Sequence, residues 1–292
     1  SIDSNYILPA KVMLKSLSVN VEEKLDIFLL YSRLSNSQIE EFSKFCTERS
    51  NAILHPIYVD AELFREMPVN DRLPIETYFR LLALFILPEN IERILWLDAD
   101  MIIKSDITRF YRTDMGNTSI AVMKDQGSAI IIAECHERLH LQNDSVYFNA
   151  GVILFNLEKI RKHWSKETLF EWTNKIQYRL EYLDQDILNL MFEKDKLISS
   201  NIWNYQIKSW TEIKEENLLC AAIIHYVGPI KPWNDKYDNK AKWIWWSYYC
   251  ACFDKRKYYI FCIKNVWHIF FSKYLDKKLT ILKKLIKKII SK

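Results

Sequence analysis

The sequence contains few glycines, and their positions exclude two common ways of binding phosphate. Four occur in 292 residues, at Gly116, Gly127, Gly151 and Gly228, whereas roughly 7% of residues is usual. The two closest are eleven residues apart, so neither G-x-G-x-x-G nor G-x-x-x-x-G-K-[ST] is present. A nucleotide bound by this chain must have its phosphates held by something other than a glycine-rich loop.

Long apolar runs and a cysteine framework are also missing. No uninterrupted apolar segment approaches the roughly 18 residues of a membrane span. Six cysteines are scattered without C-x-x-C spacing, which predicts reduced, mostly buried thiols in a cytoplasmic protein. Apolar residues make up 49% and charged residues 27%, so a sizeable folded core is expected. The length fits one large domain, or one domain with an appendage.

Charge is divided unevenly along the chain. Residues 255–292 hold twelve basic and one acidic side chain, a net charge of +11. The total of +4 therefore leaves −7 for residues 1–254. Because nucleic-acid binding needs a basic face on the body of the protein, we expect no nucleic-acid partner. We expect a catalytic domain over residues 1–238 and a helical, aromatic and basic extension over 239–292.

The tail is patterned as a basic amphipathic helix. Leucines and isoleucines recur at helical spacing from position 279 to 290, and lysines fill the positions between them. Such a helix lies in the plane of an anionic membrane surface, which predicts a cytoplasmic protein held peripherally on the inner face of the cell membrane. The alternative is a terminal helix that packs on the body and exposes its lysines.

Helical and strand patterns alternate through the first 125 residues. The hydrophobic patterning predicts strands over residues 25–31, 52–58, 93–97, 119–123, 152–156 and 222–225. It predicts helices over residues 7–19, 35–46, 76–85, 165–179 and 184–194. This order favours an α/β fold, a Rossmann-like, mostly parallel central sheet flanked by helices. The chain opens directly on a strand-end loop, so we expect a first strand upstream of Ser1.

Two carboxylates follow the predicted strand over 93–97. Asp98 and Asp100 flank Ala99, and alternate side chains of an extended segment face the same way. Two carboxylates this close repel each other unless a cation lies between them. Their hard oxygen ligands suit Mn²⁺ or Mg²⁺, which bridges to a diphosphate in place of a glycine-rich loop. The simpler interpretation is a solvated turn after a strand.

Two further segments carry polar side chains beside small or helix-starting residues. In His225-Tyr226-Val227-Gly228-Pro229-Ile230-Lys231-Pro232-Trp233, the histidine is a candidate Mn²⁺ ligand and the lysine a candidate phosphate contact. Asn149 precedes an Ala-Gly pair, and Asp184-Gln185 begins a predicted helix, with Asp184 a possible N-cap. Such amides and carboxylates suit hydrogen bonding to sugar hydroxyls.

Together these motifs, in this order, resemble glycosyltransferase family 8. The resemblance runs from Asp3 to about Trp233 and rests on D-x-D, F-N-A-G, D-Q-D-x-L-N and H-Y-x-G-P-x-K-P-W. The family includes bacterial lipopolysaccharide galactosyl- and glucosyltransferases. It implies a GT-A fold and retaining transfer of a hexose, galactose or glucose, from a UDP-sugar in the presence of Mn²⁺. A glycan, a lipid-linked glycan or a glycoprotein is the implied acceptor.

The resemblance also implies roles for individual residues. Asp98, Asp100 and His225 match the metal ligands. Five positions match contacts to the UDP-sugar: Asp3, Asn5, Arg80, Gly228 and Lys231. Ala99, between the two aspartates of the D-x-D, is counted with them. The positions matching the catalytic pocket around the donor sugar are Asp125, Asn149, Asp184 and Gln185. Because an amide is a poor nucleophile, we favour same-face attack over a covalent intermediate.

Two alternatives belong to other functional classes. One is a catalytically silent protein that binds a nucleotide sugar. The other is a phosphohydrolase, since D-A-D-M-I is similar to a D-x-D-x-[TV] nucleophile loop, with Ile102 at the Thr/Val position. The sequence leaves the transferred sugar and the acceptor open.

Overall fold

The computed structural model describes residues 1–65, 67–68 and 75–253. The basic helix predicted near the C-terminus lies outside the described residues and stays a prediction. Within the described ranges, no helix has the length and apolar character needed to cross a membrane. The described cysteines are free: Cys46, Cys135, Cys220, Cys250 and Cys252.

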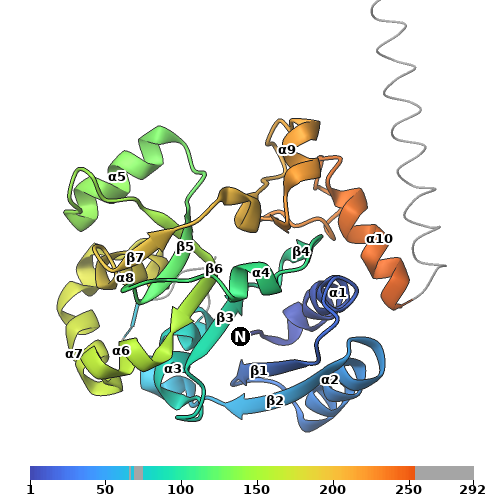
Figure 1. The fold of residues 1–292 in the computed structure, drawn as a ribbon, viewed down its shortest axis with the longest axis horizontal. Coiled ribbons are helices and arrows are strands. Elements are labelled where there is room, and N and C mark those ends of the chain that lie inside the picture. The colour runs from blue at the N-terminus through green and yellow to red at the C-terminus, as the bar shows by residue number, and fades with distance from the viewer. Residues whose placement is uncertain (66, 69–74, 254–292) are drawn as a thin grey trace, which may run out of the picture.

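The amino-terminal part is a parallel strand pair covered by helices (Figure 1). β1 (Leu25–Tyr31) and β2 (Ala52–Tyr58) pair in parallel register and are joined by α2 (Asn36–Arg49). Ser35 begins α2 through a capping box with Gln38. The predicted helix before β1 is α1 (Ile7–Ser18).

Two further sheets carry the rest of the strands. One has the order β3-β6-β5-β7 and the other β4-β9-β8. Their bounds are β3 (Arg93–Leu97), β4 (Met101–Ile103), β5 (Ile120–Lys124), β6 (Phe148–Asn156), β7 (Lys196–Ile198), β8 (Tyr205–Gln206) and β9 (Ile223–His225). β6 runs antiparallel to both neighbours, β3 and β5, and β4 runs antiparallel to β9.

The sheets are therefore mixed, and the expected predominance of parallel pairs is not found. The α/β class itself is confirmed. The prediction missed the pairing of β6 because alternation of helix and strand, which favours parallel sheets, stops after residue 125. β6 also begins at Phe148, four residues earlier than predicted. The prediction missed these residues because polar Asn149 interrupts the apolar pattern, although Asn149 and its neighbours in the strand are buried. β4, β7 and β8 are too short to produce a clear hydrophobic pattern.

The structure describes further helices along the rest of the chain. They are α3 (Phe79–Ile86), α4 (Thr108–Tyr111), α5 (Ala129–Leu139), α6 (Leu157–His163), α7 (Lys166–Ile176), α8 (Leu183–Met191), α9 (Glu215–Cys220) and α10 (Lys242–Cys252). Short 3₁₀ turns include η1 (Ser4–Tyr6), η2 (Ala61–Phe64), η3 (Ile75–Tyr78), η4 (Gln177–Arg179) and η5 (Asn201–Asn204). α10 packs beside α1, with Trp245 fully buried against Val12 and Tyr226 (Figure 1). The domain boundary predicted at residue 238 stays a prediction.

A cleft of about 700 Å³ separates β1 from β3. Residues of α1, including Leu14 and Leu17, line it, as do Ala83 and Leu87 from the α3 region. Ser1 also lines this cleft, and the N-terminus lies between the two strands in Figure 1. The first strand expected upstream of Ser1 stays a prediction.

Candidate active site

Asp98 follows directly after β3 and is held by three groups. Its backbone N–H donates to the carbonyl of Gly151 on the neighbouring strand, at 2.9 Å. Its carboxylate Oδ1 accepts from Arg80 Nη2 at 3.1 Å and from Trp96 Nε1 at 3.0 Å. Asp98 is therefore oriented by neighbours on β3, β6 and α3. A solvated turn, the simpler interpretation, would not hold the side chain through such contacts.

Asp100 lies two residues further on and is buried, with 7% of its surface exposed. Its Oδ2 accepts from Lys231 Nζ at 2.5 Å, and its Oδ1 lies 3.3 Å from His225 Nε2. Burial works to raise the pKa of Asp100, but Lys231 and His225 hold it below its usual range. This carboxylate is therefore ionised at neutral pH. Ala99, between the two aspartates, is itself buried in the core.

His225 ends β9 and reaches Asp100 because β9 pairs with β4, the strand that follows the D-x-D. The register aligns Met101 with His225. The backbone also joins the two loops, since Tyr226 N–H donates to the Asp100 carbonyl at 2.9 Å. A Cβ at Gly151 would lie 2.3 Å from His225 Cε1, so only glycine leaves room for the ring.

Together the ligand atoms of Asp98, Asp100 and His225 lie within 4.8 Å of one another. Two carboxylate oxygens and one imidazole nitrogen form a donor set that suits Mn²⁺ or Mg²⁺. Asp100 Oδ1 is buried and makes no hydrogen bond, which leaves it free to coordinate. The residues present therefore fit the divalent cation that the sequence predicted.

Arg80 links Asp98 to a second acid, Asp184. Its Nε lies 2.6 Å from Asp184 Oδ2, and its Nη1 donates to the carbonyl of Ala150. Its guanidinium also lies over the Trp96 ring, 5.1 Å from the centroid. Arg80 is 7% exposed and forms a buried bridge between the two acids. The contact to the donor that the resemblance implies for Arg80 stays a prediction.

Asp184 is buried on the far side of Arg80. Its Oδ1 accepts from Thr77 Oγ1 at 2.6 Å. Burial raises the pKa of Asp184 to about 6, although the Arg80 charge and the Thr77 hydrogen bond lower it. Helix α8 has Tyr182 at its N-cap, so the N-cap interpretation of Asp184 is wrong. The residue faces inward because its side chain pairs with Arg80.

Gln185, Asn149 and Asp125 form one polar network beside the candidate metal ligands. Asn149 Nδ2 donates to Gln185 Oε1 at 3.2 Å and to Asp125 Oδ2 at 3.4 Å. Gln185 Nε2 donates to the same Asp125 oxygen at 3.3 Å, and Gln185 Oε1 accepts from Ala150 N–H at 3.0 Å. The structure thus brings these three predicted residues together from β5, β6 and α8.

The opening segment places Asp3 and Asn5 near the same cluster. Asp3 Oδ1 accepts from the backbone of Asn5 at 2.9 Å and of Tyr6 at 3.1 Å, which shapes the turn η1. The pKa of the Tyr6 hydroxyl is raised by burial and then by Asp100, Asp98 and Asp3. Tyr6 therefore faces the acids, and sequence reasoning did not select it.

Gly228 lies at the tip of the loop that joins His225 to Lys231. Its φ is +90°, which favours glycine, and a Cβ there would meet only ordinary contacts at 3.9 Å from Lys208 Cγ and Trp210 Cη2. The backbone conformation therefore selects glycine here, and crowding by protein atoms does not. Trp210 is 66% exposed beside this loop and was also not selected from the sequence.

Asn204 is a neighbour of the candidate site that no pattern in the sequence identifies. It is fully buried, at the end of η5, and contacts both Asn149 and His225. It lies in no motif, and its neighbours Trp203 and Tyr205 give only a local apolar pattern. The approach of residue 204 to residues 149 and 225 depends on tertiary structure alone.

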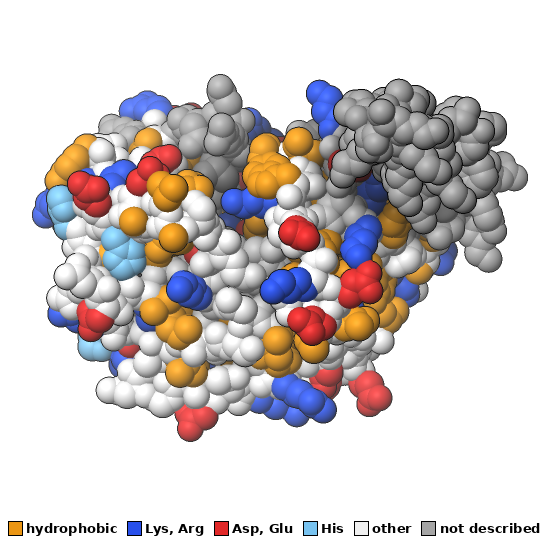
Figure 2. All heavy atoms as spheres, turned by 90° about the horizontal axis from the view of Figure 1, so that it is seen from above, with side chains coloured by type: hydrophobic (Ala, Val, Ile, Leu, Met, Phe, Trp, Pro, Cys, Tyr) orange, Lys and Arg blue, Asp and Glu red, His pale blue; other side chains and the backbone are white. Residues whose placement is uncertain are grey.

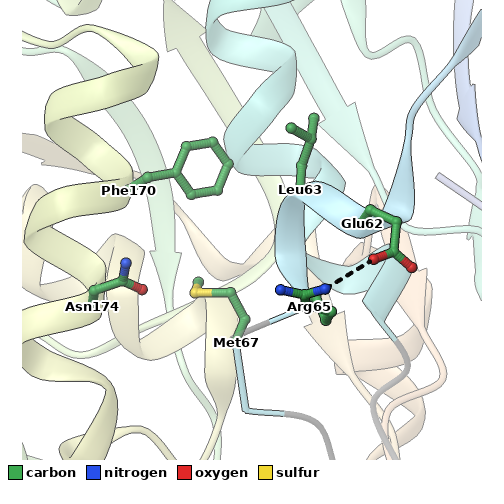
Figure 3. Close-up of a pocket in the computed structure, with 6 residues that line it drawn as sticks. All are labelled: Glu62, Leu63, Arg65, Met67, Phe170 and Asn174. Carbon is green, nitrogen blue, oxygen red and sulfur yellow. Dashed lines mark ion pairs between the residues drawn. The ribbon is translucent and has the colours of Figure 1, made fainter.

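A separate small pocket lies away from these residues (Figure 3). Its volume is about 160 Å³, and Phe170 and Asn174 from α7 face the segment after β2 across it. Its lining residues are Glu62, Leu63, Arg65, Met67, Phe170 and Asn174. Because none of the predicted site residues lines it, the pocket plays no part in the candidate active site.

Comparison with solved structures defines the class of fold. The crystal structure of the galactosyltransferase LgtC, in complex with donor and acceptor sugar analogs, aligns with a TM-score of 0.72 at 23% identity, covering 86% of this chain and 94% of that one. The glycosyltransferase GlyE of Streptococcus pneumoniae aligns with a TM-score of 0.63 at 23% identity, covering 85% and 59%. The chain therefore has a GT-A glycosyltransferase fold, as predicted.

Comparison with sequences identifies the family. The family model described as glycosyl transferase family 8 matches residues 1–237, and the chain belongs to this family. A lipopolysaccharide 1,2-glucosyltransferase of Escherichia coli is 29% identical over 252 residues, covering 80% of this chain and 72% of that protein. A lipopolysaccharide 1,3-galactosyltransferase of Salmonella typhimurium is 24% identical over 244 residues, covering 80% and 71%.

These results confirm the predicted family and the predicted enzyme class, a hexosyltransferase. They leave the phosphohydrolase alternative without support.

Proposed function

We propose that this protein is a retaining, Mn²⁺-dependent transferase that moves glucose or galactose from a UDP-sugar to a sugar acceptor. The observation that carries the proposal is the cluster of Asp98, Asp100 and His225, whose ligand atoms lie within 4.8 Å of one another at the end of β3. Ligands of α/β folds bind at such strand ends. The relatives named above, which are glucosyl- and galactosyltransferases, support the choice of sugar.

The leaving group determines what the cluster must do. A divalent cation bound to these ligands would neutralise the diphosphate and stabilise the departing UDP. Lys231 contributes a second positive charge, because its ammonium lies 2.5 Å from Asp100 Oδ2 and reaches the same space. Asp3, the half-buried N-cap of the turn η1, and Asn5, exposed within that turn, are the proposed uridine contacts.

The donor sugar lies, in this proposal, against Asp125, Asn149 and Gln185. These side chains are already hydrogen-bonded to one another, so they present a pre-formed polar wall. Asp184 is buried and paired with Arg80, and the adjacent Gln185 is an amide, so neither is a good nucleophile. Same-face attack, with the leaving phosphate accepting the acceptor's proton, therefore fits the residues better than a covalent intermediate.

Trp210 suggests where the acceptor binds. Its indole is 66% exposed, and its Cη2 would lie 3.9 Å from a Cβ built on Gly228, in the loop that joins His225 to Lys231. The turn that carries it is braced by buried Asn239, whose Nδ2 donates to the carbonyls of Lys208 and Thr211 at 3.2 and 2.9 Å. A rigid, exposed indole offers an apolar surface to the C–H face of a sugar ring.

The test of the proposal is donor turnover with defined metal. Purified protein is incubated with UDP-glucose, UDP-galactose and their N-acetyl forms, each with Mn²⁺, and UDP release is followed. We expect the wild type to release UDP from one hexose donor. In Asp100→Ala we expect both this release and the metal-dependent binding of UDP to be lost. Asp144→Asn, an exposed acid outside the site, is the control. Normal turnover by Asp100→Ala contradicts the metal assignment, and no release from any donor favours a silent nucleotide-sugar-binding protein.

Attachment to the cytoplasmic face of a membrane is a further part of the proposal. The basic residues that suggested it lie outside the described residues, and the supporting observation is their spacing in the sequence. Sedimentation with anionic phospholipid vesicles, compared with a chain ended at residue 253, tests it. Equal sedimentation of the two proteins contradicts the membrane role.

A further inference from the structure

Asn204 contacts the candidate metal ligand His225 from the side opposite the aspartates. Its Oδ1 lies 2.9 Å from His225 Nδ1, and its Nδ2 donates to Asn149 Oδ1 at 2.9 Å. The side chain is fully buried, so water does not compete for either hydrogen bond. Which end of the Asn204 amide faces His225 decides where the imidazole carries its proton.

The surrounding hydrogen bonds fix that orientation. The backbone N–H of Gly151 donates to an atom of the Asn149 amide at 3.0 Å, and because a backbone N–H only donates, that atom is the oxygen Oδ1. Asn204 must therefore direct its NH₂ group towards Asn149 Oδ1. Its carbonyl oxygen is left facing His225 Nδ1.

The tautomer of His225 follows from this orientation. An amide oxygen accepts only, so Nδ1 carries the hydrogen, and a neutral imidazole then has its lone pair on Nε2. Nε2 is the nitrogen that faces Asp100, at 3.3 Å from Oδ1. The lone pair is therefore directed into the Asp98–Asp100 cluster.

We propose that Asn204 is a positioning residue that fixes His225 in the Nδ1–H tautomer and directs Nε2 at the cation site. The proposal rests on the proposed function, since it assumes that a divalent cation binds there. Gly151 complements it by leaving space for the ring on one side, while Asn204 holds the ring at Nδ1. Partners of this kind raise metal affinity by orienting the ligand, and their loss costs about 10–100-fold in affinity.

The first measurement is the tautomer itself, in metal-free protein. The ¹⁵N chemical shifts of His225 at pH 8, assigned with a His225→Gln variant, distinguish a protonated Nδ1 from a protonated Nε2. We expect the Nδ1–H form in the wild type. An Nε2–H form overturns the proposal. The result is read from the wild type and does not depend on activity, and the His225→Gln variant serves only to assign the signals.

The second measurement compares three variants for Mn²⁺ binding, followed by electron paramagnetic resonance. Asn204→Leu removes the acceptor, and we expect mixed tautomers and Mn²⁺ binding weaker by about 10–100-fold. Asn204→Asp keeps an acceptor for Nδ1, so it should restore the Nδ1–H form and most of the affinity. Asn189→Leu, at a buried amide that bonds the Phe148 backbone, controls for the loss of any buried amide.

The outcomes separate this proposal from the proposed function. A folded Asn204→Leu protein with wild-type tautomer and Mn²⁺ affinity overturns the positioning role, as does an equal loss of affinity in Asn189→Leu. A wild type that shows the Nδ1–H tautomer but binds no Mn²⁺ contradicts the metal dependence and the cation-directing role, while the tautomer assignment stands. If Asn204→Leu does not fold, the Asn204→Asp variant is decisive. Loss of the Nδ1–H form of His225 in that variant overturns the positioning role of Asn204.

Discussion

Asp98 and Asp184 share one guanidinium, that of Arg80. Its Nη2 lies 3.1 Å from Asp98 and its Nε lies 2.6 Å from Asp184, so residues distant in the sequence are joined beneath the site. Two carboxylates this near one another would repel without the cation between them. The position of Asp98 therefore depends on Arg80 as much as on the end of β3.

Removing this bridge should destabilise the protein strongly. Arg80→Gln leaves buried Asp184 without its positive partner, and losing one partner of a buried pair costs about 3–5 kcal/mol. The free energy of unfolding from urea denaturation measures the effect. Arg112→Gln is the matched control, because Arg112 pairs with Glu23 at the surface and such pairs contribute about 0–1 kcal/mol. Similar losses in the two variants would contradict the bridging role.

The raised pKa of Asp184 predicts a pH dependence of stability. The ordinary value is 3.8 and the folded value about 6, so the folded protein binds this proton more tightly than the unfolded chain. The contribution of Asp184 therefore favours folding most below about pH 4 and is lost as pH rises through about 6. Arg80 and Asp98 face this carboxyl, and Arg80, whose pKa is raised by Asp184 and Asp98 against the effect of burial, stays charged across that window in wild type and variant.

The measurement is a comparison of wild type with Asp184→Asn between pH 4 and pH 7. Relative to the variant, the wild type should lose about 2.5 kcal/mol of unfolding free energy over this range, from a shift of about 2 pKa units. Other titrating groups cancel in the difference. A constant difference across the range would show that the pKa of Asp184 is ordinary.

Gly151 should tolerate no side chain. Gly151→Ala places a Cβ 2.3 Å from His225 Cε1, so the ring must move. We expect a stability loss of about 1–3 kcal/mol from overpacking and Mn²⁺ binding weakened at least tenfold. Gly116→Ala serves as the control, because its φ of +53° costs stability while nothing near it touches the site. Unchanged Mn²⁺ affinity in Gly151→Ala would contradict the close packing of the ring.

Substitution of Trp210 should weaken binding of the acceptor and leave hydrolysis of the donor unchanged. Trp210→Ala is expected to raise the KM for a sugar acceptor about tenfold, equivalent to ~1.4 kcal/mol, while UDP-sugar hydrolysis in Mn²⁺ without acceptor is unchanged. Trp210→Phe should keep part of the effect. Tyr178→Ala, at an aromatic side chain that is 81% exposed, is the control. A change in donor hydrolysis would place Trp210 on the donor side.

Surface composition alone would not have selected Trp210. Hydrophobic side chains are interspersed with charges of both signs over the face in Figure 2, and large exposed ones such as Ile130, Leu219 and Tyr178 occur elsewhere in the described chain. What distinguishes Trp210 is its contact with the Gly228 loop and its braced turn.

Local sequence patterns predicted the strands and helices whose formation depends mainly on residues near one another in the sequence. β1, β2 and β3 have the predicted bounds, because each is a short segment rich in apolar residues with polar residues on both sides. The antiparallel placement of β6 could not be predicted, since pairing direction depends on how the chain returns across the sheet. β8, two residues long, carries too little pattern to detect.

The same division applies to the site. Asp98, Asp100, His225 and Lys231 were found from motif and family resemblance, and the structure brings them together. Arg80 and Asp184 were selected too, but their mutual pairing was not foreseen. Asn204 was missed because an isolated asparagine beside aromatic residues carries no signal until the chain folds.

The pairing of Met101 with His225 has a consequence for the order of events during synthesis. Asp100 and His225 are 125 positions apart, and they meet only when β9 pairs with β4. A nascent chain that has not yet released residue 225 from the ribosome holds both aspartates but lacks the third ligand. Closing so long a loop makes this contact one of the slower steps of folding. The proposed cation site is therefore complete only late in the life of the newly made chain, and if the site binds Mn²⁺ as proposed, that binding would report completion of folding.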